Sequence, residues 1–233
     1  MRGALPDYVK KLGDSEPFNF KCNPEVECFT DCCRQLDLAL TPYDVLRLKA
    51  ILGISSAQFL DQYGIIDQDE GDAFPQVYLT MIDDGRASCP FVTVNGCTVY
   101  EGRPGACRTY PLGRGSYQKT NGQQEDFHVL LTEPHCKGFT DANQLTISKW
   151  IKDQGISPYN MMNDLVMTVL HHDKIRHGFK PTTDQIADYL LALYNLDEFR
   201  LKIAGSASEV AKMNDTELLT FAIKWLHHEL FGQ

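Results

Sequence analysis

The chain has 233 residues, of which 43% are hydrophobic, and a formal net charge of −9 at pH 7. This length and apolar content suit an ordinary buried core, in one large domain or two small ones. The acidic balance argues against a nucleic-acid partner, which needs a basic surface, and no stretch approaches the roughly 20 apolar residues of a membrane span.

Two capped helices are predicted near the start of the chain. Thr41 is a good N-cap, Asp44 stands where a capping box needs an acid, and Gly53 ends a run of apolar residues with helical spacing. A second, shorter helix is predicted to begin at Ser55 or Ser56.

Short strands and turns are predicted to follow these helices. Residues 65–75 are acidic and punctuated by Gly and Pro, which indicates a loop. Asn95-Gly96 between two β-rich runs indicates a hairpin, with Cys97 at the start of the returning strand. The remaining assignments here are a strand over 77–81 before the Asp84-Gly85 turn, an irregular stretch over 101–123, and a last strand over 127–131.

From residue 141 onward the pattern changes to helix and contains no cysteine. The predicted helices cover residues 145–152, residues 157–170 with closure near His177-Gly178, a third starting at Thr182 or Thr183, and a last starting at Asn214 or Asp215. We therefore predict an α+β, helix-dominated fold. A cysteine-rich metal-binding half with short β-hairpins covers residues 1–140, and a helical region over 141–233 follows, either packed on the first or separate from it.

Eight cysteines dominate the first half: Cys22, Cys28, Cys32, Cys33, Cys89, Cys97, Cys107 and Cys136. Cysteines that stop at mid-chain indicate ligands more than core residues, and thiolates are the ligands of zinc and of iron–sulfur clusters. An even count also suits four disulfides. However, no apolar stretch of signal-peptide length lies near the N-terminus, so we expect a cytoplasmic protein, where disulfides are disfavoured.

The adjacent pair Cys32-Cys33 limits how metal can be bound. Neighbouring side chains point about 100° apart on a helix and to opposite faces of a strand, so the pair is poorly placed to bind one metal atom. They serve two centres, or two irons of one cluster, or one of them is a bystander. If both groups of cysteines share one metal centre, the expected ligands are Cys28, Cys32 or Cys33, Cys97 and Cys107. Cys22 and Cys136 are then less favoured as ligands.

The segments 32–33, 41–44, 89–91, 97–104, 107–111 and 135–136 carry a resemblance to a known family. Together they resemble the YkgJ-type cysteine-cluster family, described as a zinc- or iron-chelating domain, over residues 20–138. The stretch 97–111 is the most specific piece. The opening cysteines are spaced more widely here than the family's usual Cys-x-x-Cys-x-x-Cys-Cys. The resemblance implies a metal-binding domain and leaves its activity open.

The spacing favours an iron–sulfur cluster, most simply [4Fe–4S], over zinc. Structural zinc uses paired knuckles of the form Cys-x2–4-Cys, and Cys28-x3-Cys32 is the one pair that fits. Wide spacing in Gly/Pro loops suits one or two larger clusters. Arg103 and Arg108 are candidate neighbours of an anionic cluster, and ordinary surface charge is the alternative. The alternative function is a zinc-binding structural or interaction module; in either case the partner is an unidentified protein or redox partner.

Other constellations are weaker. The paired histidines at 171–172 and 227–228 have no carboxylate at ligand spacing, so we interpret them as surface or helix-end residues. His135, beside Cys136, is the one histidine expected near the metal. Flagellin lysine methylases carry a similar cysteine-rich domain, so a lysine methylase-like enzyme is a second alternative by analogy. The chain has neither a glycine-rich S-adenosylmethionine loop nor a Cys-x3-Cys-x2-Cys motif.

Overall fold

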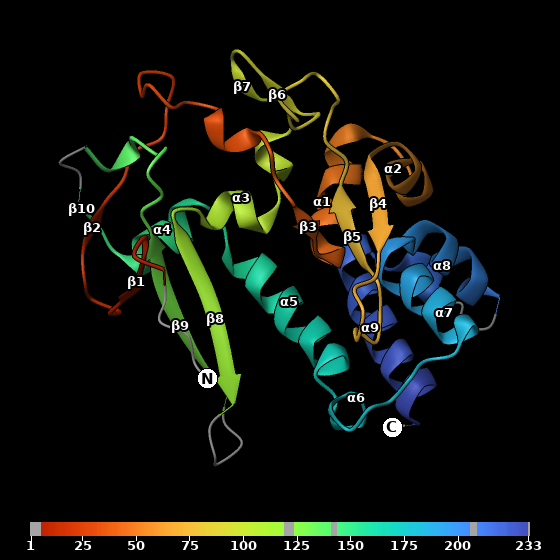
Figure 1. Ribbon diagram of the computed structural model, residues 1–233. Coiled ribbons are helices and arrows are strands. Elements are labelled where there is room, and N and C mark those ends of the chain that lie inside the picture. The colour runs from red at the N-terminus through yellow and green to blue at the C-terminus, as the bar shows by residue number, and fades with distance from the viewer. Residues whose placement is uncertain (1–5, 119–123, 141–143, 206–208, 233) are drawn as a thin grey trace.

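The computed structural model describes residues 6–118, 124–140, 144–205 and 209–232. Within these ranges, nine α-helices and ten short strands confirm an α+β fold in which helix dominates. The elements pack around two separate hydrophobic cores. Figure 1 shows the two parts, with the sheet of β8 and β9 on one side, the helical bundle on the other, and α5 running between them.

The larger core joins helices from both halves of the sequence. α1 (Pro42–Leu52) packs on α5 (Ser157–Leu170) and α9 (Asp215–Phe231), and α2 (Ser56–Tyr63) packs on α8 (Leu196–Ala204). α7 (Thr183–Tyr194) lies against α1, α8 and α9. The division into residues 1–140 and 141–233 remains a prediction, and the first two helices share their core with the helical region.

The helix starts agree with their sequence signals. The Thr41 hydroxyl accepts from the Asp44 N–H at 3.2 Å, and Asp44 Oδ2 accepts from the Thr41 N–H at 2.8 Å, so the predicted capping box is confirmed. Gly53 ends α1 with a φ of 67°, a left-handed conformation that favours glycine. The cap of α2 is Ser55, and the later helices begin after Thr182 and Asn214 as predicted.

Three helices in the second half differ from expectation. α4 (Ile147–Asp153) begins after Thr146, two residues later than predicted. The closure near His177-Gly178 belongs to a separate turn of helix, α6 (Asp173–Arg176), because α5 has already ended at Leu170. α8 follows α7 after Asn195 alone, with no Gly or Pro to mark the break. None of the described helices combines the length and the apolar run needed to cross a bilayer.

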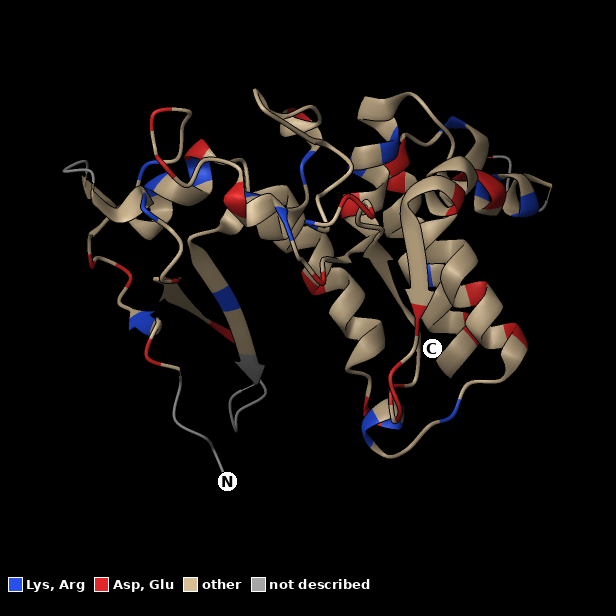
Figure 2. Cartoon of the chain, turned by 45° about the horizontal axis from the view of Figure 1, so that its top comes forward, with Lys and Arg blue, Asp and Glu red and all other residues tan. Residues whose placement is uncertain are grey.

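A three-stranded antiparallel sheet covers part of the helical core. Its order is β3 (Ala39–Leu40), β5 (Gln76–Leu79) and β4 (Gly64–Asp67). The loop predicted over residues 65–75 is therefore wrong at its start, because Ile65 and Ile66 pair with β5. Apart from Asp67, which ends β4, the acidic residues of this stretch follow the strand, and Figure 2 marks them in red on the ribbon there.

The predicted hairpin around Asn95 is present but shorter. β6 (Val92–Thr93) pairs with β7 (Gly96–Cys97), so the turn residues are Val94 and Asn95 instead of Asn95 and Gly96. Gly96, with a φ of 108°, is the first residue of the returning strand. After Cys97 the chain turns into the 3-10 helix η2 (Tyr100–Gly102) and does not continue as a strand.

The smaller core lies under a second antiparallel sheet with the order β1 (Val9–Leu12), β9 (Gln124–Leu131) and β8 (Leu112–Gln118). β2 (Phe18–Asn19), β10 (Gln144–Leu145) and α4 complete this part. The irregular stretch predicted over residues 101–123 is wrong for α3 (Gly105–Thr109) and β8. Gly115 misled the prediction, since it makes room for the Phe127 ring, which a Cβ would meet at 2.2 Å.

Candidate metal centre

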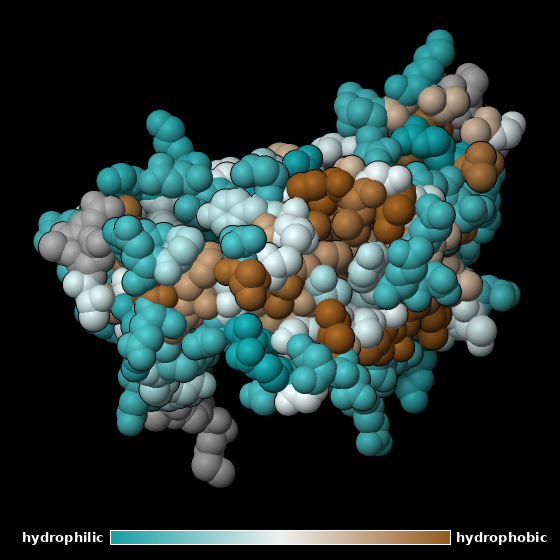
Figure 3. Space-filling view, turned by 90° about the horizontal axis from the view of Figure 1, so that it is seen from above, coloured by the Kyte–Doolittle hydropathy of each residue, from teal (hydrophilic) through white to brown (hydrophobic). Residues whose placement is uncertain are grey.

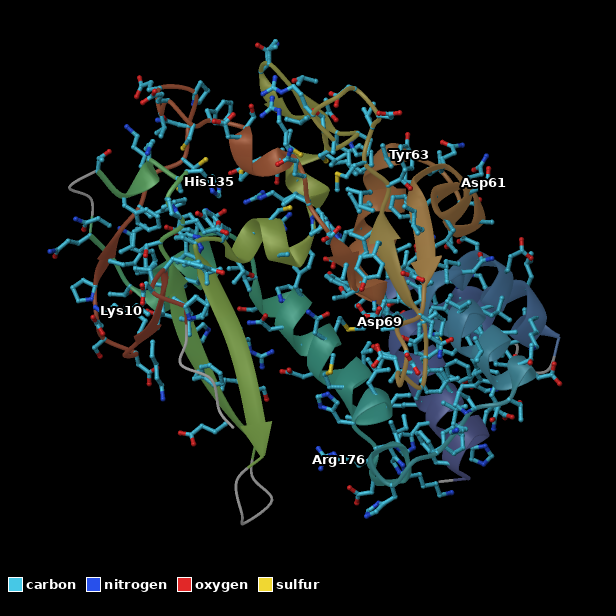
Figure 4. All side chains as sticks on the ribbon, in the orientation of Figure 1. Lys10, Asp61, Tyr63, Asp69, His135 and Arg176 are labelled. Atoms are coloured by element: carbon cyan, nitrogen blue, oxygen red, sulfur yellow. The ribbon has the colours of Figure 1, made fainter. Side chains whose placement is uncertain are left out.

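The cysteines lie where the two parts of the molecule meet. Cys32 and Cys33 belong to the 3-10 helix η1 (Asp31–Cys33), drawn in orange-red above α3 in Figure 1. In this view the green segment that follows β9 lies on one side of η1, and β6 and β7 lie on the other. Figure 4 shows His135 near this region, with yellow sulfur atoms beside it. The described cysteines are all free of disulfides.

The first thiol group consists of Cys22, Cys28 and Cys136. The Lys137 N–H donates to Cys28 Sγ at 3.0 Å, which joins two segments far apart in the sequence. Burial raises the pKa of Cys22 to about 11, and the negative charges of Cys28, Cys32 and Cys136 add to this shift. Cys136 packs against the smaller hydrophobic core.

The second thiol group consists of Cys33, Cys89, Cys97 and Cys107. The Cys89 N–H donates to the Cys33 carbonyl at 2.9 Å, and Cys97 is in the hairpin strand that follows Cys89. Although Cys107 has an exposed edge, the surrounding protein desolvates it and raises its pKa to about 12, with contributions from Cys89 and Cys97. Cys89 and Cys97 pack against the larger hydrophobic core.

Cys32 lies between the two thiol groups. The negative charge of a Cys32 thiolate raises the pKa of Cys22 in the first group and of Cys89 and Cys107 in the second. The Cys33 thiol donates a hydrogen bond to it, which lowers the pKa of Cys32 to about 7 and raises the pKa of Cys33. The adjacent pair thus lies at the boundary of two thiol groups, each associated with a different hydrophobic core.

Backbone amides point at several of the sulfurs. Burial raises the pKa of Cys89, Cys97 and Cys136, and in each case the N–H two residues later opposes the shift by donating to the sulfur. These donors belong to Phe91, Val99 and Gly138. Amide donors to sulfur stabilise thiolates, as metal ligation requires, and in iron–sulfur sites they also set the potential.

The two predicted arginines have different surroundings. Arg103 stacks on Tyr100, with its Cζ atom 3.7 Å from the centre of the ring. Its positive charge favours the thiolate forms of Cys22, Cys97 and Cys107. Arg108 is buried, and it donates to the carbonyls of Glu101, Arg103 and Gln154. Among the other arginines near the second cysteine run, Arg114 pairs with Asp126 and Asp164.

Two residues near the thiols were missed from the sequence. The Tyr110 hydroxyl is buried and has no hydrogen-bond partner at normal distance, although it lies near Cys136 and Glu133. Asp44 is buried, accepts from the Gly105 N–H at 2.7 Å, and acts on Cys107 by its charge. Only the resemblance pointed to these positions, because a tyrosine or a capping aspartate carries no metal signal of its own.

The donor set fits a metal centre, although it is not closed on a single point. Tyr110 is a buried donor that a Cys136 thiolate would satisfy. Burial raises the pKa of Cys22 and of Cys107, and the charges of neighbouring thiolates raise both pKa values further. In the described part of the chain, no three cysteine, histidine or acidic side chains lie close enough to hold one metal ion. The paired histidines lie elsewhere, where His172 and His227 pack on Phe231.

The chain matches a known protein family. The CxxCxxCC family, described as "Putative zinc- or iron-chelating domain", matches residues 21–137, which span all eight cysteines. No curated protein and no solved structure matches the chain.

Proposed function

The chain belongs to the CxxCxxCC family of zinc- or iron-chelating domains, and on this premise we propose that it is an iron–sulfur protein with two four-thiolate centres side by side. One centre would use Cys22, Cys28, Cys32 and Cys136. The other would use Cys33, Cys89, Cys97 and Cys107. Because reduced thiols are needed to take up the metal, the proposal places the protein in the cytoplasm.

The adjacency of Cys32, which lies between the two thiol groups, to Cys33, a member of the second, carries this proposal. Cys32 completes the first group to four sulfurs, and Cys33 already interacts with Cys89 and Cys107 in the second. Adjacent residues cannot easily bind one metal atom, but they can each face a different one. Two groups of four thiolates therefore use every cysteine of the chain.

The wide spacing of the cysteines along the sequence, in loops rich in Gly and Pro, supports iron–sulfur clusters over zinc. A tetrahedral zinc ion with bonds of about 2.3 Å needs its four sulfurs roughly 3.8 Å apart. The described side chains include no such tight group. A four-iron cube is larger than one ion and takes cysteines that stand farther apart. When bound, such a cluster supplies one-electron chemistry, and the chain's own amides and Arg103 stabilise its negative charge.

The metal assignment is tested by purifying the full chain without oxygen and measuring iron, acid-labile sulfide and zinc per chain. We expect about eight irons and eight sulfides, with broad visible absorption that bleaches on reduction. Stoichiometric zinc without sulfide or colour would overturn the iron–sulfur assignment and favour the alternative of a structural zinc module.

The division of ligands is tested with single serine substitutions. Cys136→Ser and Cys107→Ser should each remove about half of the iron, and the double variant nearly all of it, because independent sites lose metal additively. His135→Ala, next to a proposed ligand, is the control and should keep full iron. Complete metal loss in both single variants would show one shared centre instead.

A protein redox partner is part of this proposal. Val94 and Tyr100, on either side of Cys97, are 94% and 53% exposed, and Ile51 of α1 is 42% exposed. Figure 3 shows apolar side chains at the surface on this upper side of the molecule. Exposed apolar residues around a buried charge centre are typical of docking surfaces. Val94→Asp should slow electron transfer from a reductase without changing the iron content.

A further inference from the structure

The Tyr110 hydroxyl is buried and forms no hydrogen bond in the described part of the chain, an unfavourable state for a buried donor. We propose that this hydroxyl donates to the Cys136 thiolate when metal is bound, which makes Tyr110 a positioning residue for one centre alone. The inference rests on the proposed four-thiolate centre of Cys22, Cys28, Cys32 and Cys136, and it adds to that centre a residue that is not a ligand.

The tyrosine is held in place by its surroundings. It lies at the C-terminal end of α3, where its N–H donates to the Ala106 carbonyl at 3.2 Å. Its ring packs edge-on against Phe20, with the ring centres 5.8 Å apart, and Phe20 packs in turn on Trp150. The Trp150 indole N–H donates to the Thr109 carbonyl at 3.1 Å, which fixes the chain just before the tyrosine. These contacts restrict both the ring and its backbone, so the position of the hydroxyl is set before metal binds.

Two backbone hydrogen bonds hold the segment of Cys136 beside this ring. The Leu131 N–H donates to the carbonyl of Pro111, the residue after the tyrosine, at 2.9 Å. The Lys21 N–H donates to the Gly138 carbonyl at 2.9 Å, which ties the chain just after Cys136 to the residue that follows the packed phenylalanine. Cys136 and the tyrosine also pack against the same smaller core.

Two acceptors lie near the hydroxyl, and they differ in their surroundings. Burial raises the pKa of Tyr110, and Cys136 and Glu133 raise it further, because each favours a hydroxyl that keeps its proton. The Glu133 side chain is 37% exposed, so water competes for its carboxylate. Cys136 packs against the core, and metal binding converts its thiol to a thiolate. A hydrogen bond to a charged acceptor is stronger than one to a neutral group, so the filled centre favours Cys136.

The test follows the transfer of metal from the loaded full chain to a chelator. Tyr110→Phe removes the hydroxyl and keeps the ring that packs on Phe20. We expect about half of the metal to leave roughly tenfold faster and the other half to leave at the wild-type rate, because one centre loses a charge-assisted hydrogen bond. In the iron–sulfur form, the same variant should lower the reduction potential of one cluster only, since a donor to sulfur favours the reduced, more negative state.

Tyr194→Phe is the matched control for the loss of a buried hydroxyl. Tyr194 lies in the larger core, and its hydroxyl donates to the Leu40 carbonyl at 3.3 Å. This variant should lower the unfolding temperature and leave the release of all metal at the wild-type rate. Equal acceleration of all the metal in Tyr110→Phe, or no acceleration, would overturn the proposal.

Two double variants identify the acceptor. In a Cys136→Ser background, adding Tyr110→Phe should not change the release of the metal that remains. In a Glu133→Ala background, adding Tyr110→Phe should still accelerate half of the metal roughly tenfold. Loss of the effect in the Glu133→Ala background would make that carboxylate the acceptor and overturn the proposal. Stoichiometric zinc without sulfide would overturn the iron–sulfur assignment and leave this inference standing on the release rates, because a zinc-bound thiolate accepts the same hydrogen bond.

Discussion

Arg103 and Arg108 show how two neighbouring arginines take different roles. Arg103 acts by charge on thiols of both groups and donates to the Tyr100 carbonyl and the Gln154 side chain. Arg108 donates to three backbone carbonyls, among them those of Glu101 and Arg103 just before α3, the helix that carries Cys107. Their sequence context is the same, since both lie in the stretch between the hairpin and β8. The difference comes from which partners fold around each side chain.

Removing the charge of Arg103 should lower the reduction potential of the proposed clusters. A nearby cation stabilises the reduced, more negative state, and its loss should lower the potential by on the order of 50 mV. Protein-film voltammetry of Arg103→Gln measures the shift, and Arg103→Lys, which keeps the charge, should restore most of it. An unchanged potential in Arg103→Gln would place the arginine outside the electrostatic reach of the clusters.

Removing Arg108 should destabilise the fold instead. Arg108→Met leaves the carbonyls of Glu101, Arg103 and Gln154 without their donors, and we expect a loss of about 3 kcal/mol in the free energy of unfolding. Urea unfolding followed by circular dichroism measures it. Arg86→Met, at an exposed position, is the matched control and should stay within about 0.5 kcal/mol.

At the scale of elements, one buried cation ties α1 to the C-terminal helices. Lys49 is almost fully buried and pairs with Asp197 at 2.8 Å and Asp215 at 2.9 Å. Burial opposes ionisation of Asp197, but Lys49 and the Ser56 donors outweigh it, so the pKa of Asp197 is lowered. The lowered pKa means that this contribution to stability is present above the unfolded value of about 3.9 and is lost as pH falls through the folded value.

Lys49→Met should therefore reduce stability at pH 7 and flatten its acid dependence. We expect a loss of about 1–2 kcal/mol, a modest value because both aspartates are one-third exposed, and a shallower decline of stability below about pH 4. Lys224→Met on the exposed face of α9 is the control. Parallel pH profiles for Lys49→Met and the wild type would contradict this account.

The sequence predicts elements well where the signal is local. Thr41, Thr182 and Asn214 carry their capping partners within three residues, so the helix starts could be predicted. Strands of two residues, such as β3 and β10, could not, because their pairing depends on partners far along the chain.

The candidate site shows the same limit. Residue type and count identified the eight cysteines, and the adjacent pair raised the possibility of two centres. The spacing of the cysteines along the sequence could not predict which of their sulfurs lie close together. Cys28 lies beside the Cys136 segment, more than a hundred residues away, whereas the shared-centre hypothesis grouped Cys28 with Cys97 and Cys107. The assignment of individual ligands remains a prediction.

At the scale of the whole molecule, the two hydrophobic cores differ greatly in size. Among the described residues, the smaller core has seven buried apolar residues, including Leu12, Phe18 and Leu112, and the larger core has 31. A core this small supplies little stability alone, so small folds commonly rely on metal or disulfide links. The thiol groups lie at its junction with the helical bundle.

Metal removal should therefore unfold the two parts unequally. After chelation, hydrogen exchange of β8, β9 and β1 should rise toward unfolded rates, while α7 and α9 stay protected and most of the helical circular dichroism remains. Hydrogen exchange with mass spectrometry on loaded and metal-free protein measures this. A metal-free protein that keeps both parts equally protected would show that the metal does not hold the smaller part in place.

The adjacency of Cys32 and Cys33 also bears on electron storage. Consecutive Cα atoms are about 3.8 Å apart, so two clusters bound through this pair would lie close enough for direct tunnelling and strong mutual repulsion of added electrons. The first electron would be shared between the clusters, and the second would need a more negative potential. A protein built this way would hold two electrons on neighbouring clusters. It would release them one at a time, at two different reduction potentials.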